Sequence, residues 1–248
     1  MAETFHFNIS MISRGKSKSA VASAAYISCE KIKNEWDGVT HDYHNKKGLL
    51  HSEIFLLENI PKEFQNRSFL WNSVELNEKA SNAQLARNFI IALPKELSFE
   101  ENKKLITEFI QENFVSKGMI ADLAIHDESN EGNNNIHAHI MTTLRPINEK
   151  GQWQAKSKKE YILDDEGNKI LNKNGKPKTR KVELTDWNNK GNAEKWRESF
   201  AEICNIYLER NNLEKRVDHR SFERQGIEEI PTIHLGASAS ALERKGIE

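Results

Sequence analysis

The chain of 248 residues carries 36 Lys and Arg against 37 Asp and Glu, and its formal net charge of −1 does not by itself indicate a nucleic-acid-binding protein. Its mean hydropathy is −0.72, and no apolar run approaches the roughly 20 residues of a membrane-spanning helix. The N-terminus lacks the pattern of an export signal, and Cys29 and Cys204 are far apart in sequence. We therefore expect a reduced, cytoplasmic protein.

The N-terminal part of the sequence alternates between strand and helix patterns. Large apolar residues alternate over 4–13, which predicts a strand. A serine cap and many small residues predict a helix over 17–32 that can lie close to its neighbours. Further elements are predicted in this order: a strand over 49–59, a helix from Pro61 to about residue 80, and a strand over 85–94.

The next helix has defined ends in the sequence. Ser98 and Glu101 form a capping box, apolar residues follow at helical spacing, and Gly118 caps the end of the helix. Two strands are then predicted over 120–127 and 136–145, joined by a polar loop.

The character of the chain changes beyond Pro146. Residues 147–181 contain the turn signals DEGN and KNGK between short β-capable pieces, which predicts a basic ribbon. An amphipathic helix is predicted over 191–213, followed by irregular chain and a frayed helix over 237–248.

Together these elements favour an α+β fold, with a central antiparallel five-stranded sheet and helices mainly on one face. The basic hairpin and the C-terminal helices of 147–248 are expected to extend the same domain, so that 1–248 forms a single unit. We also expect this chain to be the N-terminal part of a longer protein, because it ends in a charged, helix-like run.

Three histidines lie close together in the segment HDESNEGNNNIHAHIMTTLRP, which begins at residue 126. His137 and His139 share one face of their predicted strand, because alternate residues of a strand point the same way. If the preceding loop closes an antiparallel pair, His126 comes to lie beside His137. Three imidazoles on rigid strands with open coordination positions are typical of a catalytic metal site. Asp122 or acidic loop residues are candidates for orienting the rings.

Basic residues are concentrated in two stretches despite the balanced total. Eleven Lys and Arg against five acids occur between Arg145 and Lys181, and no acid lies between Glu3 and Glu30. Such runs near a histidine cluster favour a phosphate-binding surface. The candidate DNA contacts are Arg14, Lys16, Lys18, Arg145, Lys156, Lys158, Lys159, Lys178, Arg180, Lys181, His219 and Arg220. Trp153, Trp187 and Trp196 are candidate platforms for stacked bases, although burial is the stronger expectation for Trp196.

A nucleophile is available in the predicted N-terminal helix. Tyr26 follows the basic stretch SRGKSKSA directly, and Tyr43 is the other early candidate. A phenol has a pKa near 10, so it needs a metal, a cation or a base to attack at neutral pH. Unaided, a helical tyrosine is more often a packing residue.

The sequence resembles the MobA/MobL (MobQ-type) group of plasmid mobilisation relaxases, within the HUH endonuclease superfamily. The resemblance runs in order across nearly the whole chain, through SRGKSKSAVASAAYISCEKI, SNAQLARNFIIALPKELS, FVSKGMIADLAIHDE, NNIHAHIMTTLRPI, TDWNNKGNAEKWRESFAE and VDHRSFERQGIEEIPTIHLG. It implies a nickase that cuts one strand at a transfer origin and stays attached to the DNA through a 5′-phosphotyrosine. Residue by residue, Tyr26 matches the nucleophile, and His126, His137 and His139 match the ligands of a divalent metal ion.

The resemblance also implies a metal ion and macromolecular partners. It does not say which acidic residue, if any, assists the tyrosine or the metal ion. The metal is one of Mn, Mg, Zn, Ni or Co, and the partners are single-stranded and hairpin-containing DNA of a transfer origin, with accessory transfer and coupling proteins. Family members often carry an acid where this chain has Asn88; Glu75 and Glu78 are candidate substitutes. The alternatives are a rolling-circle replication initiator of the same chemistry, a DNA-binding module with a structural metal, and a metal-dependent hydrolase that does not use Tyr26.

Overall fold

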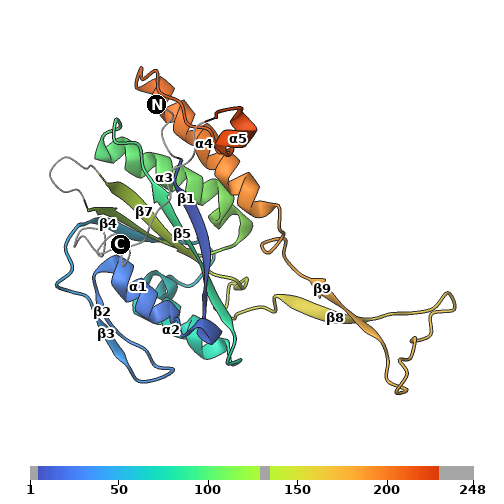
Figure 1. Ribbon diagram of the computed structural model, residues 1–248. Coiled ribbons are helices and arrows are strands. Elements are labelled where there is room, and N and C mark those ends of the chain that lie inside the picture. The colour runs from blue at the N-terminus through green and yellow to red at the C-terminus, as the bar shows by residue number, and fades with distance from the viewer. Residues whose placement is uncertain (1–4, 129–134, 229–248) are drawn as a thin grey trace, which may run out of the picture.

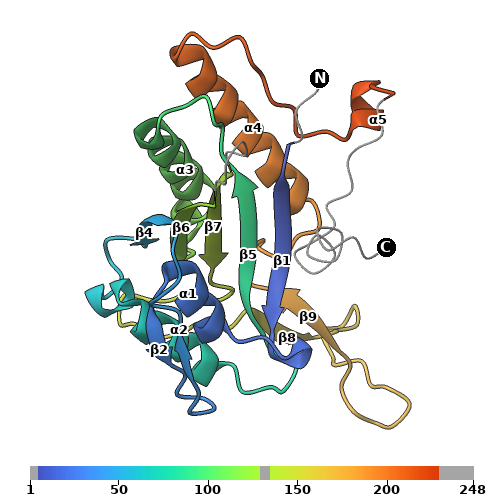
Figure 2. The same cartoon turned by 60° about the vertical axis from the view of Figure 1, so that its left-hand side comes forward.

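The computed structural model describes residues 5–128 and 135–228 and has a five-stranded antiparallel sheet at its centre. The spatial order of the strands is β1-β5-β7-β6-β4, so the central strand β7 lies between β5 and β6. Figure 2 shows β1, β5 and β7 side by side along the sheet. The α+β fold with a five-stranded antiparallel sheet is therefore confirmed. The strands are β1 (Phe7–Ser13), β4 (Leu49–Phe55), β5 (Gln84–Ala92), β6 (Ala121–Asp127) and β7 (Ile136–Thr142).

The first helix, α1 (Ala20–Ser28), begins three residues later and ends four residues earlier than predicted. The Ser19 hydroxyl accepts the Ala22 N–H at 3.0 Å, and Cys29 adopts a left-handed backbone with φ 56°, which stops the helix. A short antiparallel hairpin that the sequence reading did not predict follows, made of β2 (Lys31–Lys33) and β3 (Thr40–Asp42).

The remaining helices follow the predicted order. The helix predicted from Pro61 is divided into a short 3-10 turn, η2, and α2, because Asn66 caps α2 by accepting the Phe69 N–H at 2.9 Å. The Ser98 cap of α3 is confirmed, since its hydroxyl accepts the Glu101 N–H at 3.2 Å. The bounds are η1 (Arg14–Lys16), η2 (Lys62–Gln65), α2 (Arg67–Asn77), α3 (Phe99–Asn113), η3 (Val115–Lys117), α4 (Asn192–Arg210) and α5 (Phe222–Gln225). The helix predicted over 237–248 lies outside the described residues.

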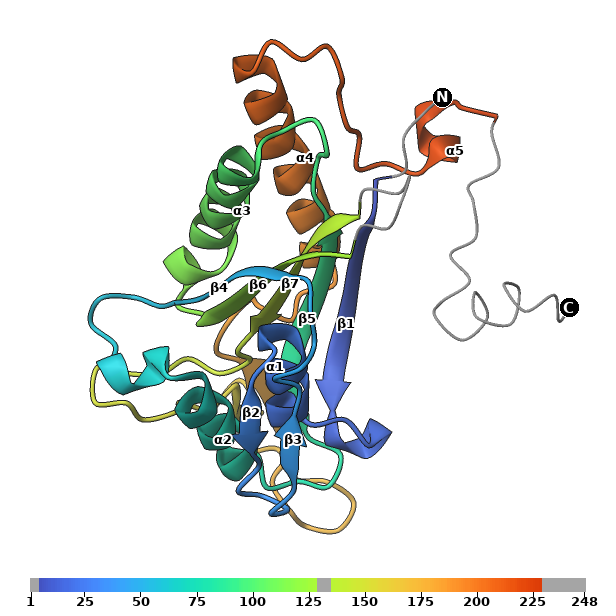
Figure 3. The same cartoon turned by 90° about the vertical axis from the view of Figure 1, so that its left-hand side faces the viewer.

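Helices cover both faces of the sheet, which corrects the expectation that they lie mainly on one face. Leu123 and Ile125 of β6 pack in one apolar cluster with residues of α3 and α4, whereas the intervening Ala124 packs in a second cluster with residues of α1 and α2. Figure 3 shows α3 and α4 above the sheet and α1 and α2 below it. The periodicity of each helix predicts one apolar stripe, but it does not say which sheet face that stripe covers.

The basic ribbon consists of β8 (Ser157–Tyr161) paired with β9 (Thr179–Glu183), and it extends away from the sheet (Figure 1). Most of its residues are exposed. The assignment of 1–248 to one domain stays a prediction. None of the helices in the described parts of the chain combines the length and apolar character needed to cross a membrane.

Candidate active site

The sheet brings the three predicted histidines together on one face. In the β6–β7 register His126 lies opposite His137, and His139 lies opposite Ala124, as the alternation of the two strands predicted. The ring centroids are 5.8 Å apart for His126 and His137, 5.1 Å for His126 and His139, and 4.9 Å for His137 and His139. All three side chains are buried, and His126 completely so.

Burial changes the protonation of this cluster. It lowers the pKa of His126, and it lowers the pKa of His139 to about 3, with positive charge on the neighbouring rings and on Lys46 adding to both effects. Both imidazoles are therefore neutral near pH 7, which is the form that binds metal ions.

Hydrogen bonds fix the orientation of two of the rings. His126 Nε2 lies 2.6 Å from the Ile27 carbonyl oxygen. Because a carbonyl only accepts, Nε2 carries the proton and Nδ1 has the lone pair, which faces Lys46 Nζ at 3.2 Å. His137 Nδ1 donates in the same way to the Asn135 carbonyl oxygen at 2.9 Å, which leaves Nε2 with its lone pair.

The three rings fit a metal ion by donor type and by spacing. With metal–nitrogen bonds of about 2.0–2.1 Å, tetrahedrally arranged imidazoles have centroids roughly 5 Å apart, as observed here. Within 5–128 and 135–228, however, no three His, Cys, Asp or Glu side chains are placed to hold an ion as they stand. At this site Nδ1 of His126 faces Lys46 Nζ at 3.2 Å, so the ammonium has to leave before that ring can act as a ligand.

Tyr26 lies beside this cluster on the exposed side of α1. Its side chain is 42% exposed, and its backbone neighbour Ile27 accepts the hydrogen bond from His126. The Tyr26 ring makes an edge-to-face contact with Tyr43, with centroids 5.3 Å apart, and Lys46 Nζ lies 4.5 Å from the Tyr26 centroid. Among the described residues its hydroxyl has no hydrogen-bond partner, so the oxygen is available to a substrate.

A groove of about 400 Å³ connects the tyrosine with the histidine cluster. Tyr26, Tyr43 and His139 line it, and Lys18 and Asn88 stand along it. Serine, alanine and isoleucine side chains complete the wall: Ser10, Ile12, Ser17, Ser19, Ala22, Ser23, Ile27 and Ile90. The groove therefore combines hydroxyl groups with apolar side chains, has a cation at its edge and has the candidate nucleophile in its wall.

The acids considered as helpers for Tyr26 have other partners. Glu75 accepts from Arg14 at 2.8 Å and from the Ala20 N–H at 2.8 Å, so it anchors the start of α1. Glu78 is paired with Arg145 and Lys156, both at 2.7 Å, and these bonds hold its pKa below the ordinary value despite partial burial. Neither lines the groove, whereas Asn88 does.

Asp122 does not orient the histidine rings, which corrects that expectation. It is wholly buried and accepts hydrogen bonds from Arg67 Nη2 and Trp71 Nε1, both at 2.8 Å. Burial lowers the pKa of Arg67, but Asp122 and Glu30 more than offset this, so its pKa lies above the ordinary value. The Arg67–Asp122 pair joins α2 to the strand that carries His126.

The candidate DNA contacts divide into internal and exposed residues. Arg14 bonds to Glu75 and to backbone oxygens and stacks 3.8 Å from the Trp36 ring, so we assign it, with Arg145 and Lys156, a structural role. Lys16, Lys18, Lys158, Lys159, Lys178, Arg180 and Lys181 are exposed. Lys158 and Arg180 both pair with Glu160, Lys181 pairs with Glu183, Arg220 pairs with Asp218, and His219 lies 3.4 Å from Glu194.

The three tryptophans are not free platforms for bases. Trp187 and Trp196, the latter on α4 itself, are buried in the apolar cluster between the sheet, α3 and α4, and Trp153 packs on Phe64 and donates to Ser73 Oγ at 2.6 Å. Sequence reasoning also missed Lys46, which contacts both His126 and Tyr26. Its only signal is its place in the polar run THDYHNKK, and the hairpin that brings this run to the site was not predicted.

The sequence and the fold are similar to those of known proteins. The MobA/MobL family model matches residues 18–245. The chain is 39% identical to the conjugal transfer protein TraA of Agrobacterium fabrum, over 97% of this chain and 22% of that protein. It is 35% identical to a probable mobilization protein MobA of Bifidobacterium longum, over 98% of this chain and 45% of that protein. A solved structure described as the "Molecular Basis of Vancomycin Resistance Transfer in Staphylococcus aureus" superimposes with a TM-score of 0.73 and 32% identity, covering 88% of this chain and 100% of the other.

This chain belongs to the MobA/MobL family. It spans less than half of the length of the TraA and MobA relatives.

Proposed function

We propose that this chain is the nicking domain of a conjugative mobilisation relaxase, an HUH endonuclease that forms a covalent 5′-phosphotyrosine at a plasmid transfer origin. The observation that carries the proposal is one groove in which an exposed tyrosine with an unpartnered hydroxyl stands beside a cluster of three buried histidines. Family membership supports it, because named relatives are conjugal transfer and mobilisation proteins.

In the proposed reaction the Tyr26 oxygen attacks the scissile phosphorus in line. A bond from that oxygen to phosphorus forms, and the bond from phosphorus to the 3′ oxygen breaks. The phenolic proton passes to solvent, and the departing 3′ oxygen takes up a proton and becomes a hydroxyl. Because one phosphodiester replaces another, the strand can be resealed by the reverse reaction. Helix α1 holds Tyr26 in place, since Ser19 and Glu75 fix its start and the Ile27 carbonyl bonds to His126.

A divalent ion would be held by His126 Nδ1, His137 Nε2 and His139. When bound, such an ion supplies positive charge to a non-bridging phosphate oxygen. Three imidazole nitrogens favour Mn, Zn, Ni or Co over Mg by ligand preference. The hydrogen bonds of His126 to Ile27 and of His137 to Asn135 fix which nitrogen each ring offers.

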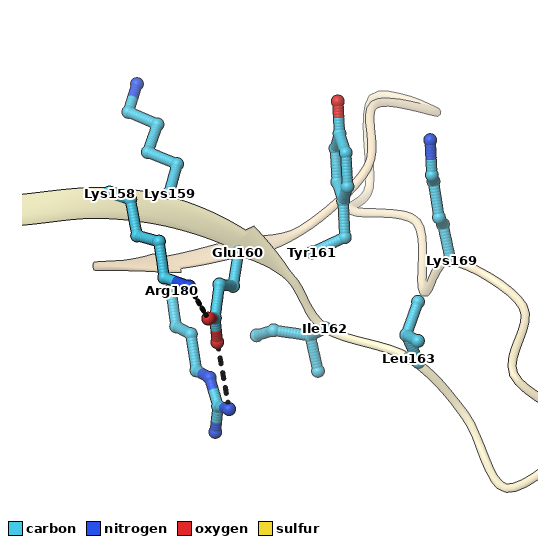
Figure 4. Close-up of a pocket in the computed structure, with 8 residues that line it drawn as sticks. All are labelled: Lys158, Lys159, Glu160, Tyr161, Ile162, Leu163, Lys169 and Arg180. Carbon is cyan, nitrogen blue, oxygen red and sulfur yellow. Dashed lines mark hydrogen bonds and ion pairs between the residues drawn. The ribbon is translucent and has the colours of Figure 1, made fainter. Parts of the chain in front are cut away.

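The basic ribbon offers a DNA-binding face. Lys159 and Lys181 are paired across the ribbon and share one face with Tyr161, whose ring lies 3.9 Å from Lys169 Nζ. Figure 4 shows Tyr161 and Lys169 pointing to the same side, and Glu160 on the opposite side with its two dashed ion pairs. An aromatic ring flanked by unpaired or weakly paired cations suits backbone contacts and base stacking. We propose that this face binds hairpin-containing and single-stranded transfer-origin DNA in the cytoplasm, together with accessory transfer and coupling proteins.

The test is adduct formation on single-stranded transfer-origin DNA. We expect Tyr26→Phe to bind DNA and Mn²⁺ but to form no covalent product, a loss of more than about 10³-fold in rate, equivalent to roughly 4 kcal/mol. Tyr43→Phe is the matched control, since it lines the same groove and touches Tyr26. Wild-type protein should carry DNA on the Tyr26 peptide by mass spectrometry. Cleavage by Tyr26→Phe without any adduct would instead mean a water nucleophile.

A further inference from the structure

Lys46 places a positive charge between the two parts of the candidate active site. Its Nζ lies 3.2 Å from His126 Nδ1 and 4.5 Å from the centroid of the Tyr26 ring. Its side chain is only 17% exposed. Among the described residues, the nearest carboxylate is that of Glu128, 3.5 Å away and 46% exposed, which makes a weak pair in solvent. The closest partner of this cation is thus a neutral ring.

The loop that carries Lys46 is attached to the sheet at the histidine cluster. The Lys46 N–H bonds to the Tyr43 carbonyl oxygen at 2.8 Å, and the Asp127 N–H bonds to the Gly48 carbonyl oxygen at 2.8 Å. Gly48 has φ +93°, and an added Cβ would come within 2.8 Å of the Asp127 carbonyl oxygen. The loop can therefore approach the end of β6 this closely only with glycine at position 48, and this approach sets Lys46 beside His126.

We propose that Lys46 contacts the scissile phosphate during the nicking reaction and stabilises the charge that develops on it. This inference rests on the proposed function. A phosphate held between Tyr26 and the histidine nitrogens would lie beside the ammonium, whose carboxylate partner among the described residues is the half-exposed Glu128 at 3.5 Å. A lysine ammonium is a compact charge on a flexible stem, so it can turn from His126 to a phosphate oxygen. In doing so it gives up His126 Nδ1, the nitrogen that the metal site needs.

The position of Lys46 also predicts an effect that does not involve DNA. In the protein without metal, its ammonium faces the same lone pair that a divalent ion would use. Removing the ammonium therefore removes a competitor and a like charge, so Mn²⁺ affinity should rise or stay equal. A lysine that only held the loop in place would give the opposite result, since its loss would loosen the histidine cluster.

The experiment compares Lys46→Met with Lys47→Met on single-stranded transfer-origin DNA. Lys47 is the adjacent residue and is exposed, which makes it a matched control. We expect Lys46→Met to slow adduct formation by about 10²-fold, as the loss of one preorganised electrostatic group does. Calorimetric titration should give Mn²⁺ affinity at or above wild type, and Lys46→Arg should recover part of the rate because it restores the charge.

Three outcomes would overturn the inference. Adduct formation by Lys46→Met at the rate of Lys47→Met would mean that the cation does not act on the phosphate. A second outcome is that Lys46→Met binds Mn²⁺ more weakly than wild type or fails to fold, while Lys46→Arg is no more active than Lys46→Met. Either result would show that Lys46 only holds the loop in place. Absence of an adduct in wild type and Lys47→Met alike would overturn the proposed function, and the role of Lys46 with it.

Discussion

The two faces of the central sheet pack against different chemistry. On the face covered by α3 and α4, aromatic rings pack against one another, with Phe109 in contact with Phe7, Phe114 and Phe200 at centroid distances of 5.4 to 5.9 Å. Arg87 is buried there as well, over the Trp196 ring, and burial lowers its pKa to about 10.

The face covered by α1 and α2 is built from small side chains and paired polar groups. Ala20, Ala24 and Ala25 of α1 are fully buried, so the helix backbone approaches the sheet closely enough for the Ile27 carbonyl to reach His126. The buried Arg67–Asp122 pair on this face is fully hydrogen-bonded between its two side chains. The face covered by α3 and α4 contributes most of the apolar packing. This packing allows the face covered by α1 and α2 to hold histidines and ion pairs next to the groove.

The largest expected effect on stability comes from the aromatic face. Phe109→Ala should lower the free energy of unfolding by about 3–5 kcal/mol, because it leaves a cavity among rings that cannot collapse fully. Urea denaturation measures the change. Phe69→Ala is the control, since that ring is 44% exposed on α2. If Phe109→Ala lowers the free energy of unfolding no more than Phe69→Ala does, the face covered by α3 and α4 does not contribute most of the apolar packing.

A substitution on the polar face should affect ligand binding more than folding. His137→Ala removes one of the three rings, and we expect Mn²⁺ affinity to fall at least about 10²-fold, or about 2.7 kcal/mol, with a smaller loss of unfolding free energy than for Phe109→Ala. Calorimetric titration with Mn²⁺ checks it. His51→Ala on β4 is the control, because that ring pairs with Glu53 away from the cluster. Equal Mn²⁺ affinity in all three proteins would remove the metal site from the proposal.

The ribbon of β8 and β9, unlike the two sheet faces, has few buried groups. Its charged side chains are therefore its main means of binding DNA. Lys159→Gln with Lys181→Gln should lower the slope of log affinity against log salt for single-stranded DNA by about 1.4, since each phosphate contact contributes about 0.7. Binding titrations from low to high salt measure the slope. Lys156→Gln is the control, because its ammonium is bound to Glu78 and should leave the slope unchanged. The same slope in the double variant and wild type would show that the ribbon is a solvated surface only.

The sequence by itself determined the features that depend on local periodicity. Alternation along β6 and β7 placed His126, His137 and His139 on one face, and the Ser98 cap marked where α3 begins. These signals are readable because side chains two apart on a strand, or at the first turn of a helix, have fixed relative directions.

Only the tertiary structure decided which charged residues are internal and which are free. Glu75, Glu78 and Asp122 looked available in the sequence, but they bind Arg14, Arg145 and Arg67, partners 61, 67 and 55 positions away. The same holds for Lys46, which meets His126 across 80 positions through a hairpin too short to leave a clear pattern. Such pairs depend on how the helices and loops pack on the two faces of the sheet. The local periodicity of the sequence does not predict that packing.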